Sequence, residues 1–321
     1  SLTITSHSQQ SGWFWQNPLP QGNDAYDIKM FNSGTGYCRT DYCILKTTNM
    51  GNNWQIILTV DYIQFVNLQD IDFINEFTGY YIYSNKIHKT TNGGSNWVVL
   101  YTYSNFYPNQ MKWLNEMTGY AMQSSSYAGT KMNKTTNGGL GWFTVFNDTS
   151  IFIKAISFPS ATTGYIAGIT RLAVNRIAKF LKTTNSGSSW DSITISNLQD
   201  LSTAYFINDL SGYITGNRIP PNGPNILRTS NGGLSWDVLP FSYGNIFSKL
   251  GFINFNTGYG SFGGLKKTTN AGANWLDLGL FFSVNDFSFF DNQNIFTCGS
   301  KGSLESSTNG GLNWSANSSG F

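Results

Sequence analysis

Acidic side chains that could share general acid–base chemistry are grouped at one place in this 321-residue sequence. Asp27, Asp70 and Asp72 occur in two short segments with alternating apolar residues, and Lys29 and Lys112 occupy related positions. Hydrolysis of a glycosidic bond uses two carboxyl groups roughly 5 to 10 Å apart. These aspartates are the best candidates for such a pair, and the alternative is a set of ion pairs with the two lysines.

Other catalytic constellations are missing from the sequence. His7 and His88 are the only histidines, so a histidine-based triad or a zinc site lacks its side chains. The sequence contains no aspartate-rich calcium loop and no glycine-rich phosphate loop. We therefore assign no catalytic residue, expect neither a metal nor another cofactor, and predict that the protein is not an enzyme.

A group of cations is the second candidate site. Arg171, Arg176 and Arg218, three of the five arginines, fall in extended loops that also contain Tyr127 and Lys131 and no acidic residue. Such a group can bind a carboxylate, a sulfated or uronic sugar, or an acidic protein surface. The alternative is a set of solvated loop tips that keep the protein soluble.

Seven copies of one short box determine where these residues can lie. Each copy has Gly two residues after an Asn and Trp three residues after that Gly. The boxes span residues 46–54, 89–97, 134–142, 182–190, 228–236, 267–275 and 306–314. Their asparagines and tryptophans are Asn49 and Trp54, Asn92 and Trp97, Asn137 and Trp142, Asn185 and Trp190, Asn231 and Trp236, Asn270 and Trp275, and Asn309 and Trp314. A repeat period of roughly 40 residues is typical of a β-propeller with four-stranded blades.

A second landmark gives the phase of the repeat. Thr-Gly-Tyr or a close variant precedes the box in six repeats, and the seventh has Asn-Ile-Phe at that place. Apolar residues at a spacing of two precede this landmark and indicate the first strand of each blade. The landmark begins the second strand, the third strand leads into the box, and the fourth begins at the Trp.

The box is then the turn between the third and fourth strands. Asn side chains bond their own backbone two residues on in many turns, and Gly supplies a positive φ. We expect each Trp to be buried between neighbouring blades, where a large ring fills the gap between twisted sheets. Seven near-identical copies suit a scaffold better than a single functional site.

The boxes resemble the Asp-box, or BNR, repeat of Ser-x-Asp-x-Gly-x-x-Trp type, with Asn in place of Asp in all seven copies. With Thr-Gly-Tyr before them, they are most similar to the propeller family of the photosystem II assembly and stability factor and its secreted bacterial relatives. The resemblance extends over roughly residues 13–315. It implies an all-β, seven-bladed propeller of four-stranded antiparallel blades over residues 13–321, after a flexible arm at 1–12.

The function that follows is a non-catalytic binding module that recognises a protein or glycan partner through one face of the ring. Blades three to five carry the longest segments between the second and third strands, and insertions on one face often mark a binding face. One alternative is a carbohydrate-active hydrolase, since sialidases carry Asp-boxes, although Asn217 stands where their Arg-Ile-Pro motif has an aromatic residue. Another is an assembly chaperone like the photosystem II factor.

Composition favours an extracellular or cell-surface protein. Charged residues make up 11% of the chain and aromatic residues 16%, and the formal net charge is +2. A nearly neutral chain does not favour nucleic acid as a partner, and the sequence contains no apolar run of about 18 to 20 residues that would insert into a membrane. Because no basic-then-apolar leader occurs near Ser1, we expect that a signal peptide was removed or never present.

The cysteines and the chain ends leave alternatives open. Cys38 and Cys43 flank a four-residue turn and would face each other across a hairpin as a disulfide or as two thiols, whereas Cys298 lacks an obvious partner. Ring closure has two candidate strands, residues 13–19 and the segment around Trp314. The simplest closure lets the N-terminal strand pair at the outer edge of the seventh blade.

Overall fold

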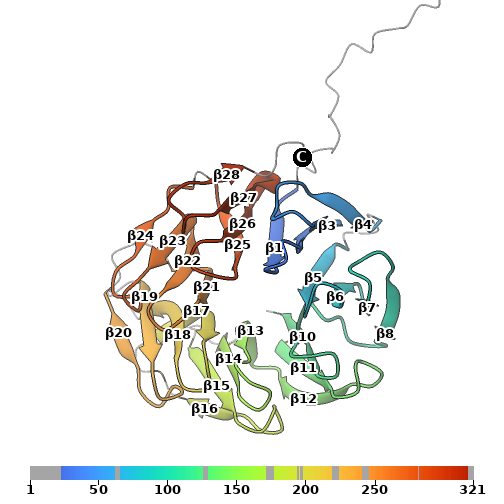
Figure 1. Ribbon diagram of the computed structural model, residues 1–321. Helices are drawn as coiled ribbons and strands as arrows, with labels where there is room; N and C mark the ends of the chain where they lie inside the picture. The colour runs from blue at the N-terminus through green and yellow to red at the C-terminus, as the bar shows by residue number, and fades with distance from the viewer. Residues whose placement is uncertain are drawn as a thin grey trace, which may run out of the picture.

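The computed structural model describes residues 23–61, 66–125, 129–170, 177–193, 195, 198–218, 224–240, 246–280 and 282–316. Within these ranges the chain forms seven four-stranded sheets, each antiparallel and built from consecutive strands. Figure 1 shows the sheets as blades around a central axis. The predicted seven-bladed β-propeller is confirmed. No helix in the described ranges is long and apolar enough to cross a membrane.

The first four blades have the following strands. Blade 1 contains β1 (Ala25–Met30), β2 (Gly36–Thr40), β3 (Cys43–Thr47) and β4 (Gln55–Thr59). Blade 2 contains β5 (Leu68–Phe73), β6 (Gly79–Tyr83), β7 (Lys86–Thr90) and β8 (Val98–Thr102). Blade 3 contains β9 (Gln110–Trp113), β10 (Gly119–Ser125), β11 (Gly129–Thr135) and β12 (Phe143–Asp148). Blade 4 contains β13 (Ile151–Ser157), β14 (Gly164–Thr170), β15 (Ala178–Thr183) and β16 (Asp191–Ile193).

The last three blades complete the ring. Blade 5 contains β17 (Leu198–Phe206), β18 (Gly212–Arg218), β19 (Pro224–Thr229) and β20 (Asp237–Leu239). Blade 6 contains β21 (Lys249–Phe252), β22 (Gly258–Phe262), β23 (Gly264–Thr268) and β24 (Leu276–Asp277). Blade 7 contains β25 (Val284–Phe289), β26 (Ile295–Gly299), a short 3-10 helix η1 (Ser300–Gly302), β27 (Leu304–Ser307) and β28 (Ser315–Ala316).

Burial changes from the axis to the rim of each blade. In blade 1 all residues of β2 are buried, whereas in β4 none is. The second strand is covered on both faces by neighbouring blades, so even its polar residues, Arg39 and Thr40, are buried. The core is correspondingly divided into seven hydrophobic clusters, one at each junction between neighbouring blades.

Aromatic stacking connects consecutive blades. The Tyr of Thr-Gly-Tyr in one blade stacks on the large ring at the end of the inner strand of the next, as in Tyr37 on Phe73, with 3.5 Å between ring centroids. Further stacked pairs are Tyr80 on Trp113, Tyr120 on Phe158, Tyr165 on Phe206 and Tyr213 on Phe252. The sequence predicted both positions as strand residues but not their mutual contact.

The box closes the turn between the third and fourth strands through two side chains. In the first box, Oδ1 of Asn49 accepts a hydrogen bond from the backbone N–H of Asn53 at 3.0 Å, and Oγ1 of Thr47 accepts one from Gly51 at 3.1 Å. The same pair of bonds recurs in the other six boxes. The predicted bond from Asn to a residue two positions on is therefore wrong. The Asn side chain accepts a bond from the residue four positions on, across the turn. The bond that spans two residues is accepted by Oγ1 of Thr47 from the backbone N–H of Asn49.

The glycine and tryptophan positions of the box behave differently. The Gly two residues after Asn has φ between 79° and 90° in all seven boxes, so the predicted positive φ is confirmed. Each Trp lies at a junction, but only Trp54 is fully buried and the other six are half-buried. Five of these six pack edge-on against the ring at the end of the inner strand of their own blade, as Trp142 does against Trp113 at 5.7 Å.

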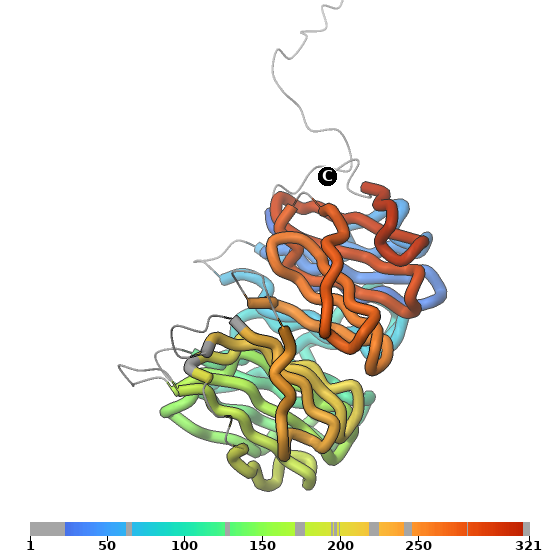
Figure 2. The backbone as a smooth tube through the Cα atoms, turned by 90° about the vertical axis from the view of Figure 1, so that its left-hand side faces the viewer, coloured from blue at the N-terminus to red at the C-terminus, as the bar shows by residue number. Residues whose placement is uncertain are grey.

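The ring closes between blades 7 and 1. Both Figure 1 and the side view in Figure 2 show these first and last blades next to each other. The position beside β27 is filled by β28, which follows Trp314, so the C-terminal candidate supplies the fourth strand of blade 7. Residues 1–12 and the other candidate, 13–19, lie outside the described residues.

Cys38 and Cys43 do not face each other across the β2–β3 hairpin, as the sequence predicted they would. Cys38 lies opposite Leu45 in the β2–β3 hairpin, because the turn joining these strands is two residues long rather than four. Cys43 lies near β4 instead, with its Sγ 3.7 Å from Oγ1 of Thr59. The three cysteines are buried, and the described residues contain no disulfide between them.

Candidate functional site

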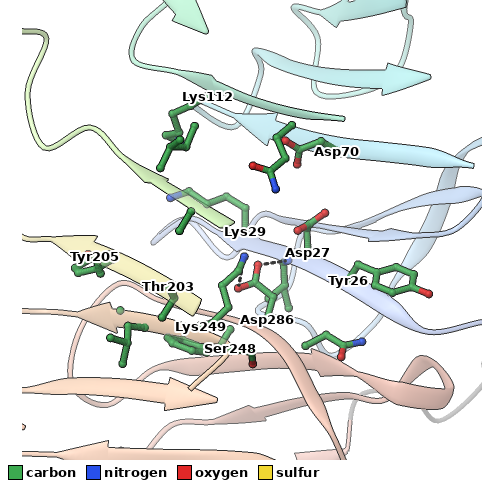
Figure 3. Close-up of a pocket in the computed structure, with 18 of the residues that line it drawn as sticks. Tyr26, Asp27, Lys29, Asp70, Lys112, Thr203, Tyr205, Ser248, Lys249 and Asp286 are labelled. Carbon is green, nitrogen blue, oxygen red and sulfur yellow. Dashed lines mark hydrogen bonds and ion pairs between the residues drawn. The ribbon is translucent and has the colours of Figure 1, made fainter. Parts of the chain in front are cut away.

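A cavity of about 910 Å³ lies at the centre of the ring and is lined by the inner strands of all seven blades. Figure 3 shows charged and polar side chains from these strands converging on it. Tyr26 and Gln69 lie near the starts of β1 and β5, and Arg39 lies next to the end of β2. Tyr205 and Phe289 lie near the ends of β17 and β25, so the lining extends along the inner strands and not only at one end of the ring.

Bulges in the inner strands aim additional residues at this cavity. The pairing of inner and second strands shifts register just before Asp27, Asp70, Ala155 and Asp286. A bulge re-aims side chains and is common beside binding sites. The extra residues at these places, namely Tyr26, Gln69, Lys154 and Asn285, all line the cavity.

Cations outnumber carboxylates among the described residues that line the cavity. The cations are Lys29, Arg39, Lys112, Lys154 and Lys249, and the carboxylates are Asp27, Asp70 and Asp286. Figure 3 shows Lys249 and Asp286 in direct contact across the junction of blades 6 and 7, with 3.1 Å between Nζ and Oδ1. Burial opposes the charge of Lys249, but Asp286 and the neighbouring aspartates raise its pKa above the usual range.

The carboxylates have structural partners in the next blade. Oδ2 of Asp70 accepts a hydrogen bond from the backbone N–H of Met111 at 2.6 Å, and Oδ2 of Asp286 accepts one from Ile28 at 3.2 Å. These N–H groups lie on the free inner edge of each sheet, where an unpaired donor is costly. Outside the cavity lining, Asp72 accepts from Trp113 at 2.6 Å and pairs with Lys112 at 3.0 Å, as the ion-pair alternative predicted.

Asp27 and Asp70 have different electrostatic surroundings. Asp27 forms an ion pair with Arg39, whose guanidinium also donates to the carbonyl of Leu68 at 2.6 Å. Burial and repulsion by Asp27 raise the pKa of Asp70 to about 8, although Arg39 opposes the shift. Two neighbouring carboxyl groups with separated pKa values can divide the roles of acid and base. Both groups, however, already have structural partners.

Lys29, Lys112 and Lys154 are the cations that face the open part of the cavity. Burial by surrounding blades, together with repulsion from Lys112, lowers the pKa of Lys29, although the side chain is in contact with solvent in the channel. Figure 3 shows the chain of Lys29 extending toward Lys112. Nζ of Lys154 lies 4.7 Å from the centroid of Phe152. A negatively charged group between these lysines would relieve their repulsion.

Only some of the loop residues predicted from the sequence as a cationic site belong to the residues that the structure describes. Lys131 lies inside β11 opposite Gln123, with its Nζ 5.8 Å from the centroid of Phe106. Tyr127, Arg171 and Arg176 lie outside the described residues, and Arg218 is described by its backbone alone, at the end of β18. The strands leading to these loops are longer than their counterparts in blades 1 and 2.

Sequence reasoning missed several cavity residues. Lys249 and Asp286 occupy the inner-strand position of Asp27 and Asp70, so the repeat register could have found them. Arg39 comes from a second strand and Lys154 from a bulge. The repeat pattern carries no signal for either. The described residues contain no group of His, Cys, Asp and Glu suited to hold a metal ion.

Comparisons with known proteins add information on the fold. No family model and no curated protein matches the chain. Among solved structures, YCF48 bound to a D1 peptide has a TM-score of 0.70 at 17% identity, covering 90% of this chain and 95% of the other. The structure resembles the YCF48 propeller. YCF48 from Cyanidioschyzon merolae also gives a TM-score of 0.70 at 17% identity, covering 92% and 98% of the two chains.

An enzyme propeller is also similar. The GH74 xyloglucanase from Xanthomonas campestris has a TM-score of 0.60 at 10% identity, covering 92% of this chain and 60% of the enzyme. At these identities the likeness to YCF48 and to the xyloglucanase concerns the fold alone. The predicted similarity to the photosystem II assembly factor propeller is thus confirmed for the architecture.

Proposed function

We propose that the protein is a non-catalytic binding module that takes an acidic peptide segment of a partner protein into the mouth of the central cavity. The observation that carries this proposal is the surplus of lysines there. Of Lys29, Lys112 and Lys154, only Lys112 has an ion pair within the described part of the chain. Carboxylates bound between such cations form charge-assisted hydrogen bonds, which are stronger than neutral ones.

Fold similarity supports a protein partner. YCF48, which has the same architecture, is known in complex with a D1 peptide. The backbone of an extended peptide can bond the polar side chains of the cavity wall, such as Gln69 and Asn109. A role as an assembly chaperone is one form of this function. We also propose that the protein acts outside the cell or at its surface.

The rim of blades 3 to 5 is a second surface for the same partner. We propose that Tyr127, Lys131, Arg171, Arg176 and Arg218 extend the cationic surface outward from the cavity. An anionic glycan would use the same charges, because a uronic or sulfated sugar presents similar oxygens.

Parallel arrays of acidic peptides and of glycans, probed with the intact protein at low salt, test the proposal. Peptide binding should weaken as salt rises, and peptides should be recovered uncleaved. Binding should be reduced by Lys29→Ala combined with Lys154→Ala. Loss of binding only in the triple Arg171→Ala, Arg176→Ala, Arg218→Ala variant would move the site to the rim.

A hydrolase remains the second candidate because of the carboxyl pair in the cavity. Asp70, with its raised pKa, would act as the acid, and Asp27, which pairs with Arg39, would be the second carboxyl group. Release of reducing sugar from any arrayed glycan, abolished by Asp70→Asn, would favour this function over binding alone. Asp70→Asn keeps an oxygen acceptor for the Met111 N–H.

A further inference from the structure

The junction between blades 7 and 1 lacks two kinds of contact that recur at most of the other junctions. At five other junctions a Tyr stacks on the next blade, and at four the box Lys reaches a backbone carbonyl of the next box, as Lys46 does at Gly93 O, 2.8 Å away. Similar lysine bonds occur at Lys134, Lys182 and Lys267. In blade 7 the Tyr is replaced by Phe296 and the Lys by Ser306, and blade 1 presents Met30 instead of a ring.

Two cysteines lie on the two sides of this same junction. Cys38 follows the landmark ring of blade 1 directly, and Cys298 lies two residues after the corresponding ring of blade 7. In the register of the sheets, Cys38 lies opposite Ile28 and Cys298 lies opposite Asp286. Because the N–H of Ile28 donates to Asp286, these two strand pairs are directly apposed.

Repeat symmetry shows that side chains at these two places touch. At the junction of blades 2 and 3 the equivalent residues are Ile82 and Ala121, which share one hydrophobic cluster. At the next two junctions the pairs are Met122 with Ile166 and Ala167 with Ile214, and each pair again shares a cluster. Among the seven junctions, only the one that closes the ring has a cysteine at both places.

The contacts of the two thiols agree with this placement. Cys38 and Cys298 are both 0% exposed and belong to the cluster that joins blade 1 to blade 7. Burial raises the pKa of Cys298 well above its usual range, and a hydrogen bond with the Cys38 thiol adds to this effect. The two sulfur atoms are thus near neighbours.

We propose that Cys38 and Cys298 form a disulfide that closes the propeller ring. The bond joins the first blade to the last, so it locks all the blades between them into one covalent loop. A cross-link that spans most of a chain removes much of the conformational freedom of the unfolded state. It replaces, at this junction, the stacking and lysine bonds that hold the others.

The chemistry needs an external disulfide as oxidant. A thiolate of one cysteine attacks a low-molecular-weight disulfide such as glutathione disulfide, and one glutathione thiol leaves. The second cysteine then attacks the mixed disulfide and releases the second glutathione thiol, so two protein thiols are oxidised as one disulfide is reduced. Because both thiols are buried and the Cys298 thiolate is disfavoured, the exchange takes place as blade 7 docks during folding.

Peptide mapping after refolding in a glutathione redox buffer tests this inference. Remaining thiols are alkylated in denaturant before tryptic digestion without reductant. Trypsin cuts after Lys29, Arg39, Lys46, Lys267 and Lys301, so the three cysteines fall in separate peptides, residues 30–39, 40–46 and 268–301. We expect peptide 30–39 joined to peptide 268–301, with the label on Cys43.

Stability supplies the second measurement. The oxidised protein should melt roughly 5 °C or more above the reduced protein. Cys43→Ser is the matched control and should keep both the cross-link and the shift, whereas Cys298→Ser should lose both. Full alkylation of all three cysteines after oxidative refolding would overturn the proposal, and so would a link between peptides 30–39 and 40–46. Because the digest uses the unaltered chain, it decides the matter even if a variant fails to fold.

Discussion

At the scale of single residues, the box asparagine is defined by what its side-chain oxygen accepts. In the third box, Oδ1 of Asn137 accepts the N–H of Gly141 at 3.0 Å and the hydroxyl of Thr135 at 2.9 Å. An Asp offers the same oxygen at the same distance from the backbone. This explains why Asn can replace the Asp of the related boxes without any change in the turn.

Asn137→Ala should therefore destabilise the protein by about 1 to 3 kcal/mol, since a backbone donor and a hydroxyl lose their acceptor. Asn137→Asp is the matched control and should stay within about 0.5 kcal/mol of the parent. Equilibrium unfolding in urea measures both. Equal losses in the two variants would show that the amide nitrogen, and not the accepting oxygen, holds the turn.

His88 makes a pH-dependent contribution. Its ring stacks on Tyr81 with 4.2 Å between centroids, and burial together with Lys86 lowers its pKa to about 4. The unfolded chain takes up a proton near pH 6.5 whereas the folded chain does so only near pH 4, so stability is lost as pH falls through this window. His88→Phe should flatten the fall in Tm between pH 7 and pH 4. An unchanged slope would mean that His88 is charged in the folded protein.

At the scale of elements, neighbouring blades are joined by rings and hydroxyl groups supplied by the Thr-Gly-Tyr landmark. Tyr165 stacks on Phe206 and its hydroxyl donates to the carbonyl of Asp209 at 2.6 Å. The hydroxyl of Tyr259 is buried and has no hydrogen-bond partner among the described residues. The same landmark therefore contributes differently at different junctions.

This difference gives a matched pair of substitutions. Tyr165→Phe should cost about 1 to 2 kcal/mol, because it leaves a buried carbonyl without its donor while keeping the stack. Tyr259→Phe should be neutral or stabilising, because it removes a buried hydroxyl that is not bonded. Thermal unfolding of both variants provides the comparison. A larger loss in Tyr259→Phe would contradict this assignment of the two hydroxyls.

The sequence predicted the blades far better than the contacts between them. The spacing of Asn, Gly and Trp and the alternating apolar residues were enough to place the inner strands and the turns between third and fourth strands. The partner of a given ring, such as Phe73 for Tyr37, depends on how two sheets twist against each other. The local periodicity of the sequence carries no information about this twist. Cys38 shows the same limit, because its neighbour Cys298 is distant along the chain and belongs to the last repeat.

At the scale of the whole molecule, the ring brings sequence differences between the repeats together in one central cavity. Each blade contributes between two and five residues to the cavity lining, and most repeats differ at those places. The sequence could identify Lys29, Lys112 and the nearby aspartates from register alone. It could not identify Arg39 or Lys154. Arg39 reaches the cavity from a second strand and Lys154 from a bulge, and the repeat pattern predicts neither position.

The measurement that tests the central claim most directly is the affinity of the best acidic peptide from the array for three proteins. These are the parent, the Lys29→Ala and Lys154→Ala double variant, and Lys86→Ala, an exposed lysine outside the cavity lining. The account predicts at least about tenfold weaker binding for the double variant, unchanged binding for Lys86→Ala, and no cleavage of the peptide. Equal affinity for all three proteins would contradict it and place the binding surface away from the central cavity.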